Sequence, residues 1–441
     1  MDIEKTLQDL IPDNMLRRSE TTLESLLSPI RNVLHQRKMP LDSFTDLQIE
    51  LLLKVLSSMD TDKDLGAARV GEREGRVVSP YVEHLAAGFN HGIGRSGHLT
   101  APQPKAPGAS LMQQAANQVA LDAMRKFGLH NVHSGIVFPL STGMTIAISL
   151  SALRREKGVK RVLFPRIDHA SPKRGIELSG LETITTSTTL EGDAVQADLG
   201  DLEREISKNH DIAILATTTF FPPRTPDPIK EIAKMCQAHD IPLVVNNAYG
   251  VQSTSIMKTI SSAIDAGKVD VIIQSGDKNF MTPVGSAIAV SPDEEIMQWI
   301  SETYAGRASA APVVQTFAAL LAHGLKGYEA LRNQQVESKT RLEKRMTEIA
   351  SDLGQRILDV NNEIAVAMTL DGIDANDLGG RLYNRRVTGP RAIEAGEYGS
   401  CIDGYPHSYI VMNAAIGASK NDVENATTKL YKEASSHTGT T

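Results

Sequence analysis

The segment VIIQSGDKNF (271–280) decides the fold, because it joins a run of buried-strand character to a tight polar turn. That turn carries Lys278. A single lysine after a strand is nearly always a solvated surface residue. This one is enclosed by small and polar neighbours, namely Gln274, Ser275, Gly276 and Asn279. Lys278 is therefore the first candidate for chemistry.

Short apolar runs alternate with amphipathic stretches on both sides of this segment. We interpret six runs as buried strands: IVFPL (136–140), VLF (162–164), AILATT (213–218), PLVVN (242–246), VIIQS (271–275) and SAIAV (286–290). Helices, such as one over 229–239, are expected between them. The alternation predicts an α/β fold with a mostly parallel central sheet that helices cover on both faces. Ligands of such sheets bind beyond the carboxyl ends of the strands.

Helical sequence precedes the sheet region, and a mixed pattern follows it. Residues 1–60 carry leucines among charges at helical spacings, and Pro12, Pro29 and Pro40 are expected to break them into short helices. Two strand-like runs follow long helical patterns near the C-terminus, IAVAMTL (364–370) and SYIVMNAA (408–415). We predict an N-terminal helical extension (1–60), a catalytic α/β domain (61–310) and a smaller C-terminal α+β domain (311–441).

Composition limits the classes of function. The 441 residues are 41% hydrophobic and 22% charged, which suits a substantial core. The net charge of -7 argues against RNA binding by bulk charge, so any RNA contact must use a local patch. No stretch approaches the roughly 20 apolar residues that span a membrane, and the N-terminus lacks a signal-peptide core. The two separated cysteines fit a reducing, cytoplasmic setting, and no histidine or cysteine spacing suggests a metal site.

Two further turns have the character of ligand sites. In FPLSTGMTIAISLSALRR (138–155), a strand ends at Leu140 and a Ser-Thr-Gly turn opens an apolar helix. Such a turn directs backbone N–H groups and a helix dipole at an anion, usually a phosphate, although it also suits an ordinary capped helix. The segment VVNNAYG (244–250) ends another strand.

A long stretch without acidic residues lies between Glu83 and Asp122. Several glycines in it let the backbone fold around a ligand, and its basic or imidazole side chains include His91, Arg95, His98 and Lys105. We interpret the stretch as an anion cradle. The alternative is a surface loop rich in glycine and proline.

These turns, in this order, resemble the fold-type I pyridoxal-phosphate (PLP) enzymes. Longer motifs resemble the O-phosphoseryl-tRNA(Sec) selenium transferase family: GEREGRV, HGIGRSG, QPKA, NNAYGVQS, DKNFM-PVG and YAGRAS. The likeness runs from about residue 65 to 310 and recurs more weakly to the end. It implies a fold-type I transferase with pyridoxal 5'-phosphate as cofactor. It also implies conversion of O-phosphoseryl-tRNA(Sec) to selenocysteinyl-tRNA(Sec) with selenophosphate, by β-elimination of phosphate and addition of selenium.

The resemblance also implies the roles of particular residues. Lys278 would hold the cofactor and act as general base, and the other cofactor contacts would be Arg73, Thr142, Gly143, Met144, His169, Asn246 and Ser275. The substrate phosphate would be held by Arg95, Ser96, Gln103 and Arg307. Glu72 would repel a free amino-acid carboxylate, and Arg391 would contact the tRNA acceptor end. A second tRNA contact near Asp265 or Lys268 does not match cleanly and is not assigned.

Asn246 departs from the pattern of the wider fold-type I class. An aspartate usually stands there and pairs with the pyridine nitrogen. A neutral amide supports a protonated ring less well, so a weaker electron sink is expected, which a good leaving group tolerates.

The resemblance implies a homotetramer, a dimer of dimers joined through the N-terminal helices. Basic residues in 17–38 are expected to hold the tRNA acceptor arm, namely Arg17, Arg18, Arg31, Arg37 and Lys38. Two alternatives stay open. One is another PLP lyase or transferase such as a cysteine desulfurase, for which Cys401 would have to serve as a mobile nucleophile. The other is a non-catalytic RNA-binding or scaffold protein with a degenerate fold.

Overall fold

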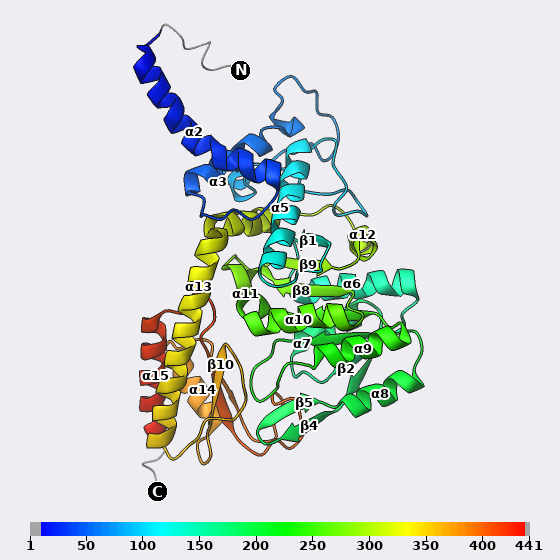
Figure 1. Cartoon of the computed structure of the whole chain (residues 1–441), viewed down its shortest axis with the longest axis vertical. Helices are drawn as coiled ribbons and strands as arrows, with labels where there is room; N and C mark the ends of the chain where they lie inside the picture. The colour runs from blue at the N-terminus through cyan, green and yellow to red at the C-terminus, as the bar shows by residue number, and fades with distance from the viewer. Residues whose placement is uncertain (1–9, 437–441) are drawn as a thin grey trace.

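A seven-stranded sheet forms the centre of the molecule. The computed structural model describes residues 10–436. The strand order is β1-β9-β8-β7-β6-β2-β3, and β9 runs antiparallel to both of its neighbours while β8, β7, β6, β2 and β3 are parallel (Figure 1). The strands are β1 (Ser134–Phe138), β2 (Arg161–Pro165), β3 (Glu182–Thr186), β6 (Ile212–Thr217), β7 (Leu243–Asn246), β8 (Val271–Ser275) and β9 (Ala287–Ser291). The mostly parallel sheet and all six predicted strands are confirmed.

Three strands of this region were not predicted. β3 is the edge strand of the sheet, and its sequence ETITT is polar because only its last residue is fully buried. A separate hairpin pairs β4 (Thr188–Glu191) with β5 (Ala194–Ala197). Neither β3 nor the β4–β5 hairpin has the apolar run that marks a strand covered on both faces.

Helices cover the sheet on both faces. α6 packs against α7 and α12, and α9 packs against α10. The helices of this region are α5 (Pro107–Lys126), α6 (Thr142–Lys157), α7 (Ala170–Leu178), α8 (Leu199–Lys208), α9 (Ile229–His239), α10 (Thr254–Ala266), α11 (Gly276–Phe280) and α12 (Glu294–Thr303). The short elements η1 (Thr61–Lys63), α4 (Pro80–Leu85) and η2 (Gly250–Gln252) lie in connecting segments.

The N-terminal region is helical, as predicted, but it is less broken than expected. α2 (Asp13–Gln36) projects from the body, and α3 (Asp46–Ser57) starts with a capping box between Thr45 and Gln48 (Figure 1). The prediction that Pro29 interrupts the region was wrong, because α2 continues through it. A proline inside a helix removes the hydrogen bond to the residue four positions earlier. That residue, Ser25, is exposed, so water can satisfy its carbonyl.

A second, smaller unit follows the sheet. Its three strands have the antiparallel order β10-β12-β11, with β10 (Ala365–Thr369), β11 (Arg391–Ile393) and β12 (Tyr409–Asn413). α14 (Ala375–Asn384), α15 (Lys420–Ser435) and the second half of α13 (Ala311–Asp352) share a separate apolar core with it. β10 and β12 confirm the two predicted runs. The division of the chain at residues 60 and 310 stays a prediction.

The long helix α13 joins the N-terminal helices to the C-terminal unit, and it bends at Gly324 (Figure 1). At the bend Gly324 has φ 56° and ψ 174°, a conformation that is essentially restricted to glycine. The chain at 40–44 enters the bend: Phe44 N–H donates to the Leu321 carbonyl at 2.9 Å, and Leu325 N–H donates to the Pro40 carbonyl at 2.8 Å. A Cβ at position 324 would lie 2.6 Å from the carbonyl carbon of Asp42.

No helix within residues 10–436 is long and apolar enough to cross a membrane.

Gly324→Ala should lower stability for two reasons, a forbidden backbone conformation and a clash with the backbone of Asp42. We expect a loss of about 1–3 kcal/mol, seen as a lower melting temperature in calorimetry. Gly354→Ala is the matched control, because Gly354 also has positive φ (65°) but a Cβ there meets open space. Equal losses in the two variants would show that the close approach of residues 40–44 contributes nothing.

Candidate active site

A cavity of about 330 Å³ opens beyond the carboxyl ends of the parallel strands. Its lining includes Lys278 after β8, Asn246 at the end of β7, Thr217 at the end of β6 and His169 after β2. Thr142 and Gly143, the first residues of α6, complete that side. The position of the cavity is the one expected for a parallel sheet. Five of the sequence-predicted cofactor residues therefore meet in one place.

The start of α6 is suited to an anion. Ser141 precedes the helix, and no side chain among the described residues caps its first N–H groups. The Thr142 hydroxyl is buried and lacks a hydrogen-bond partner within residues 10–436. Free N–H groups and the helix dipole attract a phosphate. A Cβ at position 143 would meet the hydroxyl of Ser171, so this close approach favours glycine.

The cavity also contains polar atoms that the described part of the chain leaves unpaired. They are Thr142 Oγ1, Thr217 Oγ1, Thr219 Oγ1, Asn246 Oδ1 and Asn413 Oδ1. An unpaired buried polar group costs roughly 1–3 kcal/mol, so a cluster of them at one cavity indicates a polar ligand. PLP carries a ring nitrogen, a phenolic oxygen and a phosphate, and the donor set of this cavity fits such a group.

His169 and two phenylalanines form the aromatic part of the cavity. The ring centroids of His169 and Phe220 are 6.4 Å apart in an edge-on arrangement. Burial, followed by the charges of Lys278 and Arg391, lowers the pKa of His169, so its ring is neutral at neutral pH. Arg391 lies over both phenylalanines, with its guanidinium 5.4 Å from the Phe220 centroid and 5.1 Å from the Phe221 centroid. The predicted tRNA-contacting arginine therefore stands beside the cavity.

Three predicted cofactor residues do not line the cavity, namely Arg73, Met144 and Ser275. Met144 lies in the first turn of α6, but its side chain is exposed. Ser275 is buried, and its hydroxyl donates to the carboxylate of Asp277. Six other lining residues had no role predicted from the sequence, namely Thr217, Thr219, Phe220, Tyr249, Gln252 and Asn413. A sequence signal existed for five of them: the run TTTFF (217–221) at the end of a predicted strand contains three, and the motif NNAYGVQS (246–253) contains Tyr249 and Gln252.

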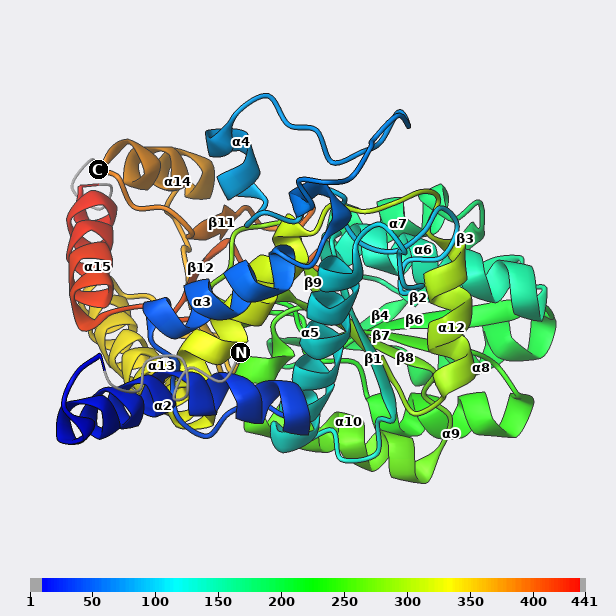
Figure 2. The ribbon, with the colours of Figure 1, turned by 90° about the horizontal axis from the view of Figure 1, so that it is seen from above.

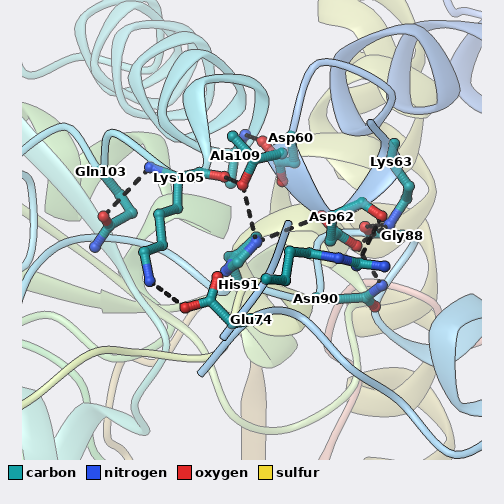
Figure 3. Close-up of polar contacts among 12 residues, drawn as sticks. Asp60, Asp62, Lys63, Glu74, Gly88, Asn90, His91, Gln103, Lys105 and Ala109 are labelled. Carbon is teal, nitrogen blue, oxygen red and sulfur yellow. Dashed lines mark hydrogen bonds and ion pairs between the residues drawn. The ribbon is translucent and has the colours of Figure 1, made fainter. Parts of the chain in front are cut away.

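Residues 94–104, the phosphate loop, contain three of the predicted phosphate contacts, Arg95, Ser96 and Gln103, and begin with a tight turn. Arg95 and His98 exchange two backbone hydrogen bonds of 2.9 and 3.0 Å, and Gly97 at the turn has φ 78°. The side chains of Arg95 and Ser96 are exposed at its tip. The far end of the loop is fixed, because Gln103 Oε1 accepts from the Lys105 N–H at 3.4 Å and Lys105 pairs with Glu74 (Figure 3).

Arg307 lies next to this loop and is half-buried. Its Nη2 donates to the carbonyl of His91, whereas its Nε is buried without a partner among residues 10–436. Burial, and then the nearby charge of Arg73, lowers the pKa of Arg307. Two neighbouring cations with an unused donor are the features of an anion site. Glu72 stands 3.6 Å from Arg73, and both side chains are largely exposed.

The phosphate-loop residues do not line the cofactor cavity of the same chain. The cavity lining lacks six predicted residues of this region: the phosphate contacts Arg95, Ser96, Gln103 and Arg307, the cofactor contact Arg73 and the substrate filter Glu72. The structure thus brings the predicted residues together in two separate groups. One surrounds Lys278, and the other surrounds Arg307.

Neither cysteine is placed for catalysis. Cys236 is buried in α9, and Cys401 is buried behind the segment that precedes His169. The Cys401 Sγ accepts from the Asp168 N–H at 3.2 Å, and burial raises the pKa of this thiol to about 12. A buried neutral thiol cannot act as the mobile nucleophile of a cysteine desulfurase. Within the described residues, no group of three or more histidine, cysteine or acidic side chains could hold a metal ion.

Comparisons with known proteins agree with this site. A family model described as O-phosphoseryl-tRNA(Sec) selenium transferase, SepSecS, matches residues 59–435. The O-phosphoseryl-tRNA(Sec) selenium transferase of Methanopyrus kandleri is 43% identical over 431 residues, which are 97% of this chain and 99% of the relative. A crystal structure of an archaeal O-phosphoseryl-tRNA(Sec) selenium transferase superposes with a TM-score of 0.93 at 42% identity, covering 96% of this chain and 98% of that one. A sphingosine-1-phosphate lyase from Burkholderia pseudomallei, 14% identical with a TM-score of 0.62, shares the fold alone.

The sheet, the lysine at its carboxyl edge and these likenesses define a PLP-dependent enzyme of fold type I. Within that class, the chain belongs to the O-phosphoseryl-tRNA(Sec) selenium transferase family, whose reaction converts O-phosphoseryl-tRNA(Sec) to selenocysteinyl-tRNA(Sec). The predictions of family, fold class, enzymatic activity and cofactor are confirmed.

Cys401→Ser should keep selenocysteinyl-tRNA formation within about fivefold of the wild type, because serine can still accept from the Asp168 N–H. Mass spectrometry of the wild-type enzyme after incubation with free cysteine should show no persulfide on Cys401. Loss of turnover in the variant together with a persulfide in the wild type would instead restore the desulfurase alternative.

Proposed function

We propose that Lys278 is the residue that holds PLP and moves the proton at Cα of the phosphoseryl group. One observation carries this proposal. A lysine without an ion pair to any of residues 10–436 shares a cavity with unpaired polar atoms and a neutral histidine. Bound PLP supplies an electron-withdrawing ring that stabilises negative charge at Cα. Lys278 would then act as general base within reach of that carbon.

The other cavity residues would orient the cofactor. Thr142 and Gly143 at the start of α6 would bind its phosphate, His169 would stack on its ring, and Asn246 would face the ring nitrogen. Met144 and Ser275 do not line the cavity, so a contact of either residue with the cofactor stays a prediction.

Lys278→Ala should abolish the visible absorbance of the bound cofactor while circular dichroism shows an unchanged fold. Turnover should fall by about 10²–10⁴-fold or more, because both the attachment point and the general base are removed. A variant that still forms a borohydride-reducible adduct with PLP would show that another lysine holds the cofactor.

The second group of residues would bind the substrate phosphate. Arg95, Ser96, Gln103 and Arg307 offer charged and neutral donors, and such contacts also stabilise the charge that develops as phosphate leaves. Arg73 would reach the cofactor. Glu72 would repel free phosphoserine, whose carboxylate is absent from the aminoacyl ester on tRNA. Selenophosphate would then deliver selenium to Cβ of the dehydroalanyl group that remains on the tRNA after phosphate has left.

We further propose that these phosphate contacts come from a second copy of the chain. The residues expected to bind the substrate phosphate do not line the cofactor cavity of their own chain. The two groups of residues would therefore meet across an interface between two chains. The loop before α4 stands away from the rest of the ribbon (Figure 2). The loop and α4 together expose large apolar side chains: Leu65, Val70, Val78, Tyr81 and Leu85. A monomer rarely leaves such a set uncovered.

A homotetramer, a dimer of two such dimers, would also use α2. This helix projects from the body and exposes apolar residues, among them Met15 and Leu23 (Figure 1). It also carries basic side chains for the acceptor arm of tRNA: Arg17, Arg18, Arg31, Arg37 and Lys38 lie in it or directly after it, and all are exposed. Arg391, beside Phe220 and Phe221, would contact the acceptor end as it enters the cavity. We expect the enzyme to work in the cytoplasm.

Hybrid enzymes test the shared site. Arg307→Ala alone should lose about tenfold to a hundredfold in turnover and keep its cofactor colour, because a charged contact to phosphate is removed. Co-assembly of Lys278→Ala with Arg307→Ala subunits should regain roughly a quarter of wild-type activity, since half of the randomly formed dimers are hybrids with one intact site of two.

If both groups of residues acted within one chain, every site in the mixture would keep a defect, and no activity would return.

A further inference from the structure

Gln252 makes two hydrogen bonds that connect the lysine turn to the C-terminal unit. It ends η2, shortly after β7, and its side chain is 4% exposed and lines the cofactor cavity. Its Nε2 donates to the backbone carbonyl of Lys278 at 2.7 Å. Its Oε1 accepts from the N–H of Ile416 at 2.7 Å. Both polar atoms of this buried amide side chain therefore have a hydrogen-bond partner.

The two partners of Gln252 belong to opposite walls of the cavity. Lys278 lies in α11, at the carboxyl edge of the large sheet. Ile416 follows β12 of the small sheet, and Asn413, Ala415 and Ile416 form the cavity wall on that side. Gln252 thus fixes the position of Lys278 relative to a wall that belongs to a different unit of the fold.

The lysine turn depends on such side-chain contacts. α11 has only five residues, and Met281 after it has φ 56°. Asn279 holds the turn to the large sheet, because its Nδ2 donates to the carbonyls of Ala248 at 2.8 Å and Ser275 at 2.7 Å. Within residues 10–436, Asn279 makes no hydrogen bond to the C-terminal unit. Gln252 supplies that link directly at Lys278.

We propose that Gln252 is a positioning residue that holds the lysine turn against the C-terminal wall of the cavity, so that the Lys278 amine stays aligned with the Cα whose proton it moves. This inference rests on the proposed role of Lys278. Gln252 itself touches neither the proton nor the leaving phosphate. Its loss should therefore reduce kcat far more than it changes KM for phosphoseryl-tRNA.

Gln252→Glu separates the two hydrogen bonds. An ionised carboxylate still accepts from the Ile416 N–H, but it cannot donate to the Lys278 carbonyl and repels it. A protonated carboxyl can donate again, and burial raises the pKa of such a group. We expect kcat to be about tenfold below wild type at alkaline pH and to recover as the pH is lowered. The visible absorbance of the bound cofactor should show a matching transition that the wild type lacks.

Gln335→Met is the matched control. Gln335 is also a buried glutamine, 3% exposed, and its Nε2 donates to the carbonyls of Ala414 at 2.8 Å and Glu363 at 3.1 Å. It holds the same wall but does not touch the lysine turn. Gln252→Met and Gln335→Met should both lower the melting temperature, whereas only Gln252→Met should reduce kcat and slow the reconstitution of colour from apoenzyme and PLP.

Two results would overturn the inference. One is a Gln252→Glu enzyme whose kcat and absorbance follow the wild-type pH profile. The other is a Gln335→Met enzyme that loses as much kcat as Gln252→Met, which would leave Gln252 a structural role alone. The Gln252→Glu enzyme is its own control for folding, because both pH states come from one preparation. The borohydride test on Lys278→Ala reports separately on the proposed role of Lys278.

Discussion

The parallel pairing of β6, β7 and β8 is the constraint on which the rest of the structure depends. Its register sets Thr217 opposite Asn246 and Asn246 opposite Ile273. Because all three strands run in one direction, the residues that follow them emerge at one edge, and Lys278 comes five positions after Ile273. Backbone hydrogen bonds between these strands thus fix the distances between the cavity residues at their ends before any side chain contributes. The helices and the C-terminal unit only close a site that the sheet has already arranged.

The sequence predicts those parts of the fold whose physical signal is local. The six predicted strands are apolar on both faces, so their burial is visible in composition alone. β3 and β11 lie at sheet edges and are short or polar, and β11, which carries Arg391, could not be recognised for that reason. Lys278, Asn246 and Thr142 were predictable because each follows a strong strand. Gln252 and Asn413 were not, because their roles arise from contacts between units far apart in the sequence.

Asn246 and its neighbours show how the site suits its reaction. Its Oδ1 is buried without a partner in the described chain, as are the hydroxyls of Thr217 and Thr219. These groups are held in place before the cofactor binds, which reduces the reorganisation that binding requires. In the proposed arrangement Asn246 faces the ring nitrogen, and its amide would leave the ring less charged than a carboxylate would. A reaction whose leaving group is phosphate needs less electron withdrawal than a decarboxylation, so a neutral partner would suffice.

The distribution of ion pairs around the phosphate loop explains why arginines remain available there. Two carboxylates of this region pair with lysines: Asp62 contacts Lys63, and Glu74 contacts Lys105 (Figure 3). A third, Asp60, accepts from the backbone N–H of Ala109 instead. Arg307 instead donates to the carbonyl of His91 and keeps a free buried Nε within the described structure. A planar guanidinium matches a phosphate in two contacts, whereas an ammonium group acts as a point charge. Because the lysines of this region pair with its own carboxylates, the arginines remain as the positive charges available to a phosphate. These arginines do not line the cofactor cavity of their own chain. In the proposed shared site, the packing of two chains would therefore set how the phosphate-binding arginines are placed relative to Lys278, and assembly would be part of substrate binding.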